Sequence, residues 1–80
     1  MELKNNEVYS FPDGREFVAR ADDDGFKLYN LKLGVSSAPV YWVSETGQIL
    51  FWGKVTNWFS EDLHDTGKMV LPEIKRLRLL

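Results

Sequence analysis

The stretch Val40–Trp52, "VYWVSETGQILFW", decides the fold because its two apolar runs meet at one tight turn. The centre, Ser44 to Gln48, has the composition of a type I turn followed by Gly47 in the left-handed conformation. Such a turn pairs Val43 with Ile49 across two antiparallel strands. The runs are rich in aromatic and β-branched residues, which favour strands. The sequence therefore predicts a β-hairpin here.

This hairpin is apolar on both of its faces. A strand with one face in water alternates apolar and polar residues, whereas a strand buried on both sides reads as a continuous apolar run. The surplus apolar face must therefore be covered, either by the rest of the chain or by another molecule. Tyr41, Val43, Ile49 and Phe51 form one face, and Val40, Trp42, Leu50 and Trp52 form the reverse face.

A second hairpin is predicted before this one. The loop Pro12-Asp13-Gly14 suits a type I turn closed by a glycine. With this loop, Tyr9 lies opposite Phe17 and Val8 lies opposite Val18.

A third hairpin is predicted around Asp22-Asp23-Asp24-Gly25, taken as a four-residue loop. It places Ala19 opposite Leu28 and Val18 opposite Tyr29. Both hairpins assign the same side chains to the buried face, although each was derived from its own turn. These are Tyr9, Phe17, Ala19, Phe26 and Leu28.

After residue 54 the alternation breaks. Ser60 is a good N-cap, two acidic residues follow it, and Gly67 suits a helix end, so a short helix is predicted over 61–66. Residues 70–80 are consistent with either a helix or an edge strand. Pro72 slightly favours a helix, because proline suits the first helical position.

Together these signals predict one mainly β domain over residues 1–80. We expect a five-stranded antiparallel meander, curled into a small SH3-like barrel or a half-open roll. A short helix and a C-terminal segment would close it. The comparison with SH3-like barrels concerns architecture alone, because no SH3 signature motif is present. The strands are expected near 6–11, 15–21, 26–32, 39–44 and 48–55.

Composition narrows the classes of function. The chain has 80 residues, a formal net charge of −2 and no cysteine, so it can form neither a disulfide nor a thiolate metal site. No run approaches the roughly 20 apolar residues that span a bilayer, and the N-terminus lacks the apolar run of a signal peptide. We therefore expect a cytoplasmic protein that does not enter a membrane.

The acidic segment Asp22-Asp23-Asp24-Gly25 is interpreted as a turn and not as a calcium loop. Placing Gly25 at the sixth position of an EF-hand loop puts Arg20 at the first position and Leu31 at the twelfth. Neither a cation nor an alkyl group can bind calcium. Aspartate and glycine are also common turn residues.

No catalytic constellation is visible. His64 is the only histidine, with Asp62 and Asp65 near it, and it is interpreted as a surface residue. The six glycines are scattered singly and form no phosphate-binding loop, and no serine lies on a nucleophile elbow. The sequence therefore predicts no cofactor, no metal site and no enzymatic activity, and an enzyme ranks third among the hypotheses.

Two functional hypotheses remain. The first is a non-catalytic protein-interaction module, or a subunit of a homo-oligomer, that uses an aromatic face. The second is a weak nucleic-acid-binding barrel in which the same aromatic residues stack on bases, while Lys54, Lys68 and the basic C-terminus supply charge. The acidic balance disfavours the second. The candidate face comprises Val40, Trp42, Leu50, Trp52 and Trp58.

Overall fold

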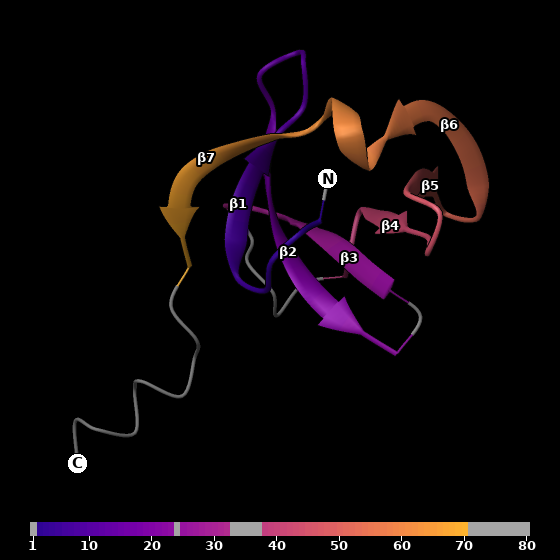
Figure 1. Ribbon diagram of the computed structural model, residues 1–80, viewed down its shortest axis with the longest axis horizontal. Coiled ribbons are helices and arrows are strands. Elements are labelled where there is room, and N and C mark those ends of the chain that lie inside the picture. Colours follow the sequence, from indigo (N-terminus) through magenta and orange to yellow (C-terminus); the bar gives the residue numbers. More distant parts are fainter. Residues whose placement is uncertain (1, 24, 33–37, 71–80) are drawn as a thin grey trace.

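The computed structural model describes residues 2–23, 25–32 and 38–70. Over these residues the protein is mainly β, and seven strands form one antiparallel sheet in the order β6-β5-β4-β3-β2-β1-β7 (Figure 1). The strands are β1 (Glu7–Ser10), β2 (Glu16–Asp22), β3 (Gly25–Asn30), β4 (Tyr41–Val43), β5 (Gln48–Phe51), β6 (Lys54–Phe59) and β7 (His64–Met69).

The registers of the three predicted hairpins are confirmed. Val8 pairs with Val18, and Val18 pairs in turn with Tyr29. In the third hairpin Val43 pairs with Ile49, as the turn with Gly47 requires. Gly47 has φ +91°, in the left-handed region where a glycine is favoured. Turn chemistry and the apolar pattern agree in each hairpin, which is why its register could be derived from local sequence.

The acidic turn is shorter than the four-residue loop that was predicted, because Asp22 pairs with Gly25. Gly25 has φ +126°, and a Cβ at this position would lie 2.5 Å from the carbonyl oxygen of Val43. Only glycine therefore allows the start of β3 to approach β4 this closely.

The prediction of five strands is wrong, because the expected strand over 48–55 is two strands, β5 and β6. They are joined by Trp52 and Gly53, whose φ angles are +50° and +82°. Two consecutive positive φ angles are typical of the two-residue type I′ hairpin turn. Asn-Gly is the usual sequence for this turn, so the Trp-Gly pair gave only a weak signal.

The helix predicted over 61–66 is also wrong. The chain forms a single 3₁₀ turn, η1 (Ser60–Asp62), and then strand β7, which pairs with β1. Asp62 Oδ2 accepts a hydrogen bond from the Phe59 N–H at 2.8 Å, so the acidic residue closes the turn instead of starting a longer helix. The free edge of β1 then offers backbone partners to β7, and this tertiary pairing overrides the local helix signals.

The sheet does not close into a barrel, so the barrel version of the prediction is wrong for the described residues. Strands β6 and β7 are consecutive in the chain, joined by η1, yet they form the two opposite edges of the sheet (Figure 1). The main hydrophobic cluster lies on one face of the strands. Its members are Leu3, Tyr9, Phe11, Phe17, Ala19, Leu28, Tyr41, Val43, Ile49 and Leu63.

The predicted C-terminal closing segment lies almost entirely outside the described residues. Val70 is described, and its N–H donates to the carbonyl oxygen of Asn6 at 2.8 Å. Within the described part of the chain, no helix is long and apolar enough to cross a membrane.

Candidate functional site

An outward-facing row of side chains crosses the sheet from β3 to β6. Strand pairing places Lys27 opposite Trp42, Trp42 opposite Leu50, and Leu50 opposite Val55. The residues that alternate with them, among them Tyr41, Val43 and Ile49, are buried in the core cluster. Because successive side chains of a strand point to opposite faces, this row lies on the face away from that cluster. Three of its four members are apolar.

Trp52 extends this row at the tip of the β5–β6 hairpin. Its ring lies 5.2 Å from that of Trp42 at an interplanar angle of 62°, an edge-to-face arrangement. Trp52 is nevertheless 60% exposed. Its φ of +50° is also rare for a bulky residue and costs about 1–2 kcal/mol. A strained, exposed tryptophan contributes little to the core.

An apolar cleft of about 380 Å³ opens beside Trp42, on the side of the β2–β3 turn. This volume lies at the lower end of the range for ligand-binding clefts. It is large enough for one or two apolar side chains of a partner. The lining residues are Asp22, Gly25, Phe26, Lys27, Trp42, Val43, Ser44, Leu50 and Gly53.

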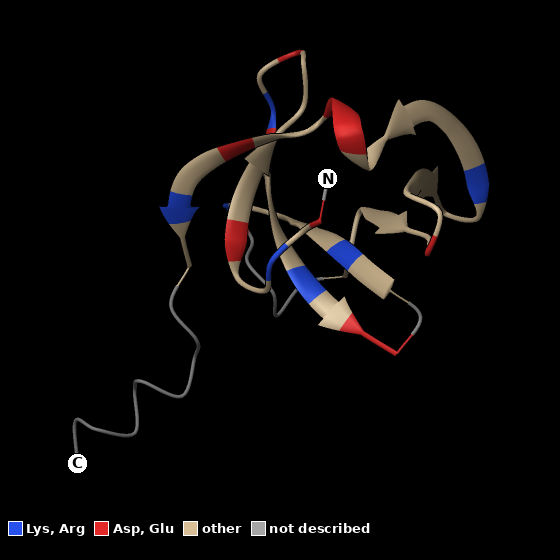
Figure 2. Cartoon of the chain, in the orientation of Figure 1, with Lys and Arg blue, Asp and Glu red and all other residues tan. Residues whose placement is uncertain are grey.

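The charges around the cleft largely cancel. The ammonium group of Lys27 forms an ion pair with the carboxylate of Asp22, and both residues line the cleft. Lys54, exposed beside the Trp52–Gly53 turn, adds one positive charge at the edge of the sheet (Figure 2). Over the described residues, the surface around the cleft is therefore aromatic and close to neutral.

The structure brings together three of the five residues predicted for the aromatic face. Trp42, Leu50 and Trp52 share the outward-facing surface. Val40 and Trp58 are partly buried and pack against the core cluster instead. The Trp58 ring lies 5.8 Å from the ring of Phe11, edge to face.

Trp58 faces inward because β6 begins at Lys54, after a turn that the sequence prediction placed inside a strand. Side chains alternate along β6, and this alternation directs Trp58 toward the core cluster.

Two exposed apolar residues of β6 were not predicted from the sequence. Val55 is 70% exposed and Phe59 is 45% exposed. The segment "KVTNWF" does alternate, with Val55, Asn57 and Phe59 more exposed than Thr56 and Trp58. That alternation was overlooked because the predicted strand ended at residue 55. We call Trp42, Leu50, Trp52, Val55 and Phe59 the aromatic face.

A separate aromatic group around Arg15 has a structural role. The Arg15 guanidinium lies 5.2 Å from the ring centre of Phe11 and 5.8 Å from those of Phe17 and Tyr41. All three rings are buried, so Arg15 covers one end of the core. The pKa of Arg15 is raised mainly by the Tyr41 side chain. Arg15 also forms an ion pair with Asp13 at 2.8 Å.

Over residues 2–23, 25–32 and 38–70, no three His, Asp or Glu side chains gather as a metal site. His64 is exposed at the start of β7, opposite Ser10. Of the acidic turn, Asp22 is engaged by Lys27, and Asp24 lies outside the described residues.

Comparisons with protein-family models, with curated proteins and with solved structures find no match for this chain.

Proposed function

We propose that this protein is a non-catalytic protein-interaction module that binds its partner through the aromatic face. The exposed Trp52 carries the proposal. It occupies a backbone conformation that a tryptophan adopts at a cost, and most of its surface lies outside the core. Tryptophan is among the residues that contribute most to binding energy in protein interfaces.

The chemistry of the neighbouring cleft favours an apolar protein side chain as the bound group. The cleft lies directly beside Trp42, and the one cation among the described residues that line it, Lys27, is already paired with Asp22. A charged ligand would have to displace this ion pair, whereas an aromatic or branched aliphatic side chain would fill the cleft without doing so. Such a side chain would bury apolar surface on both sides.

The proposal includes an SH3-like, half-open roll as the architecture that presents this face. Its support is the return of the last described strand, β7, to pair with β1 after a 3₁₀ turn. This likeness is one of architecture and assigns no ligand.

A peptide selection tests the proposed function. A random peptide library displayed on phage is selected against the wild-type protein, and the affinities of enriched peptides are then measured by titration. We expect enriched peptides to carry aromatic or aliphatic anchors and to compete with one another for one site. Trp42→Ala and Trp52→Asn should each weaken their binding at least tenfold, because the anchor loses its main contact.

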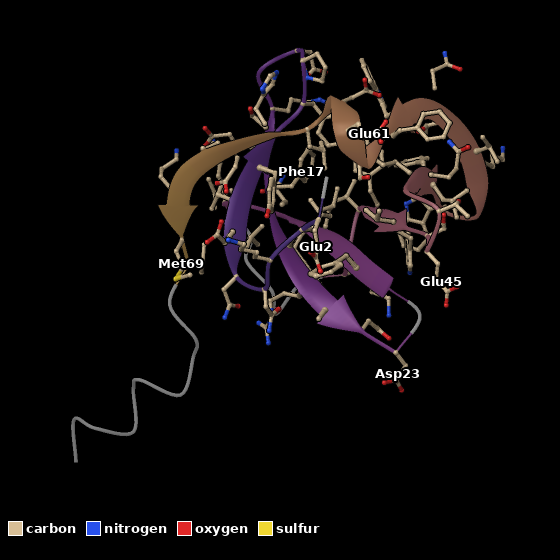
Figure 3. The ribbon with its side chains drawn as sticks, in the orientation of Figure 1. Glu2, Phe17, Asp23, Glu45, Glu61 and Met69 are labelled. Atoms are coloured by element: carbon tan, nitrogen blue, oxygen red, sulfur yellow. The ribbon has the colours of Figure 1, made fainter. Side chains whose placement is uncertain are left out.

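Met69 provides the matched control. It is another exposed apolar residue, 57% accessible, but it lies at the end of β7, far from Glu45 and the β4–β5 turn (Figure 3). Met69→Ala should leave peptide affinity unchanged. Enriched peptides that bind the wild type and Trp52→Asn equally well would show that the aromatic face is not the binding surface.

Nucleic-acid binding is the alternative that this face could also serve, through stacking of bases on Trp42 and Trp52. The two lysines predicted to attract the nucleic acid lie at opposite edges of the sheet, Lys54 on β6 and Lys68 on β7. Lys68 also forms an ion pair with Glu16 at 2.8 Å. Titration with single-stranded oligonucleotides at two salt concentrations separates the two functions. A salt-dependent quench of tryptophan fluorescence would favour nucleic acid, and an unchanged signal is expected from the protein-interaction module.

A further inference from the structure

Strand β6 forms an edge of the sheet that is open in the described part of the chain. Its inner side pairs with β5, and no described strand pairs with its outer side. Phe51 and Lys54 flank the two-residue turn and form the hydrogen-bonded pair of that hairpin. The next pair, Leu50 and Val55, then directs the backbone N–H and C=O groups of Val55 outward. By alternation, those of Asn57 point the same way.

The side chains of this edge do not protect it. Natural edge strands carry charges, prolines or strong bulges that prevent pairing with another chain. Strand β7, the other edge, follows this rule, with His64, Asp65 and Lys68 exposed along it. Strand β6 has a register shift against β5 and one charge, Lys54, at its start, but it exposes the apolar Val55 and Phe59. The exposed apolar edge is thus the one that carries part of the aromatic face.

We infer that a second copy of this chain docks antiparallel along β6, joining two sheets edge to edge. This inference rests on the proposed function and names the partner. The charges at the two ends of β6 indicate a second copy of the chain as the partner. The strand begins at Lys54, and the turn after its end carries Glu61 and Asp62 (Figure 2). Two antiparallel copies place the base of one against the acidic turn of the other, whereas parallel copies would juxtapose like charges.

The apolar side chains select the same arrangement. With Asn57 of one copy opposite Asn57 of the other, Val55 of each copy lies opposite Phe59 of its partner. Both are exposed in the single chain and lie on the same face of β6. The Phe59 N–H is held by Asp62, so the hydrogen bonds at that position would run from the Val55 N–H to the Phe59 carbonyl oxygen.

This pairing extends the outward-facing row beyond the edge of one molecule. Trp42, Leu50 and Val55 of one copy would continue into Phe59 of the other. The exposed apolar side chains of the hairpin offer on the order of 400 Å² per copy. A stable dimer needs about 800 Å² per partner, so we expect a weak dimer with a dissociation constant in the micromolar range or above.

A charge swap tests the inference, with the mass of the full chain measured by sedimentation equilibrium over a range of protein concentrations. The wild type should shift from the monomer mass toward twice that mass. Lys54→Glu and Glu61→Lys should each raise the dissociation constant about tenfold, because each creates two like-charge contacts per dimer. The double variant Lys54→Glu/Glu61→Lys should return to within about twofold of the wild type.

Lys32→Glu and Asp23→Lys make the same changes in net charge away from β6, and they should have no effect on the dissociation constant. Amide hydrogen exchange adds a second measurement. Exchange at Val55 and Asn57 should slow as the protein concentration rises, while exchange at Asp65 on β7 should not.

The outcomes distinguish the inference from the proposed function. A wild type that stays monomeric at millimolar concentration, or a double variant no better than either single one, overturns the docking along β6. If selected peptides still require Trp42 and Trp52 in that case, the interaction function stands without self-pairing. If neither peptides nor a second copy bind, both fall.

Discussion

In each of the two edge strands of the sheet, a threonine hydroxyl bridges two backbone groups. In β6, the Thr56 hydroxyl donates to the Ile49 carbonyl oxygen at 2.6 Å and accepts from the Trp58 N–H at 3.1 Å. In β7, the Thr66 hydroxyl donates to the Val8 carbonyl oxygen at 2.8 Å and accepts from the Lys68 N–H at 3.2 Å. Each bridge lies where the strand register shifts against its neighbour.

What differs is the outer surface of the two edges. Polar and charged side chains cover most of β7, and the ion pair of Lys68 with Glu16 ties it to β2. Strand β6 carries apolar side chains outward and adjoins Trp42 and Trp52. The same hydrogen-bonding arrangement is therefore found in one edge that completes the fold and in one for which we propose a binding role. Substitutions at β7 and at its connection to β6 should therefore mainly lower stability, whereas substitutions of the exposed apolar residues of β6 should mainly weaken binding.

The largest effect is expected at the connection between the edges. Leu63, between η1 and β7, is 2% exposed and belongs to the core cluster. Leu63→Ala should lower the free energy of unfolding by about 2–4 kcal/mol, because it leaves a cavity in a small core. Urea unfolding followed by fluorescence measures this loss. Val55→Ala on the exposed edge should cost less than about 0.5 kcal/mol. A loss as large as that of Leu63→Ala would show that the exposed residues of β6 also stabilise the fold.

The two threonine bridges should rank next. Thr56→Val and Thr66→Val each remove a hydroxyl that joins two backbone groups. A loss of about 1–2 kcal/mol is expected at Thr56, because the groups it leaves unpaired are partly buried. The loss at Thr66 should be smaller, since the Lys68 N–H is exposed to water. The reverse order in urea unfolding would mean that β7 depends on its bridge more than β6 does.

A smaller change, of opposite sign, is expected at Trp52. Asparagine is favoured before Gly53 in a type I′ turn, so Trp52→Asn relieves about 1–2 kcal/mol of strain. The edge-to-face contact with Trp42 that it removes contributes about 0.5–1 kcal/mol. Thermal unfolding should therefore show equal or slightly greater stability, by up to about 1 kcal/mol. Trp52→Ala serves as the control and should be less stable than Trp52→Asn, because alanine tolerates the turn less well.

The smallest effect concerns pH and the contact between β1 and β7. A hydrogen bond with the neighbouring Asp65 carboxyl raises the pKa of Glu7. The folded state thus holds this proton more tightly than the unfolded state, and stability falls as pH rises from the unfolded pKa through the folded one. Glu7→Gln should match the wild type below the unfolded pKa and become slightly more stable above the folded one. Urea titrations at several pH values test this, and equal slopes for both proteins would contradict it.

Local sequence predicted the elements whose turns have standard chemistry. The pairing of Val43 with Ile49, and that of Val8 with Val18, followed from glycine-closed turns and apolar spacing. Sequence failed where an element depends on a distant partner. The acids after Ser60 suit a helix by themselves, but Thr66 and its neighbours form β7 because β1 leaves an edge unpaired.

The amino-acid sequence by itself determined that the protein is mainly β, and that the hairpin around Gly47 has more apolar surface than one sheet face can bury. Side-chain alternation and turn chemistry act over a few residues, so both conclusions needed only local information. Tertiary structure alone decided which tryptophans face outward. The turn at Trp52 starts a new strand, so Trp58 packs inward on Phe11 while Trp42 and Trp52 stay at the surface. Which tryptophans face outward depends on the register of β6 against β5. That register is fixed only when the two strands pair in the folded protein.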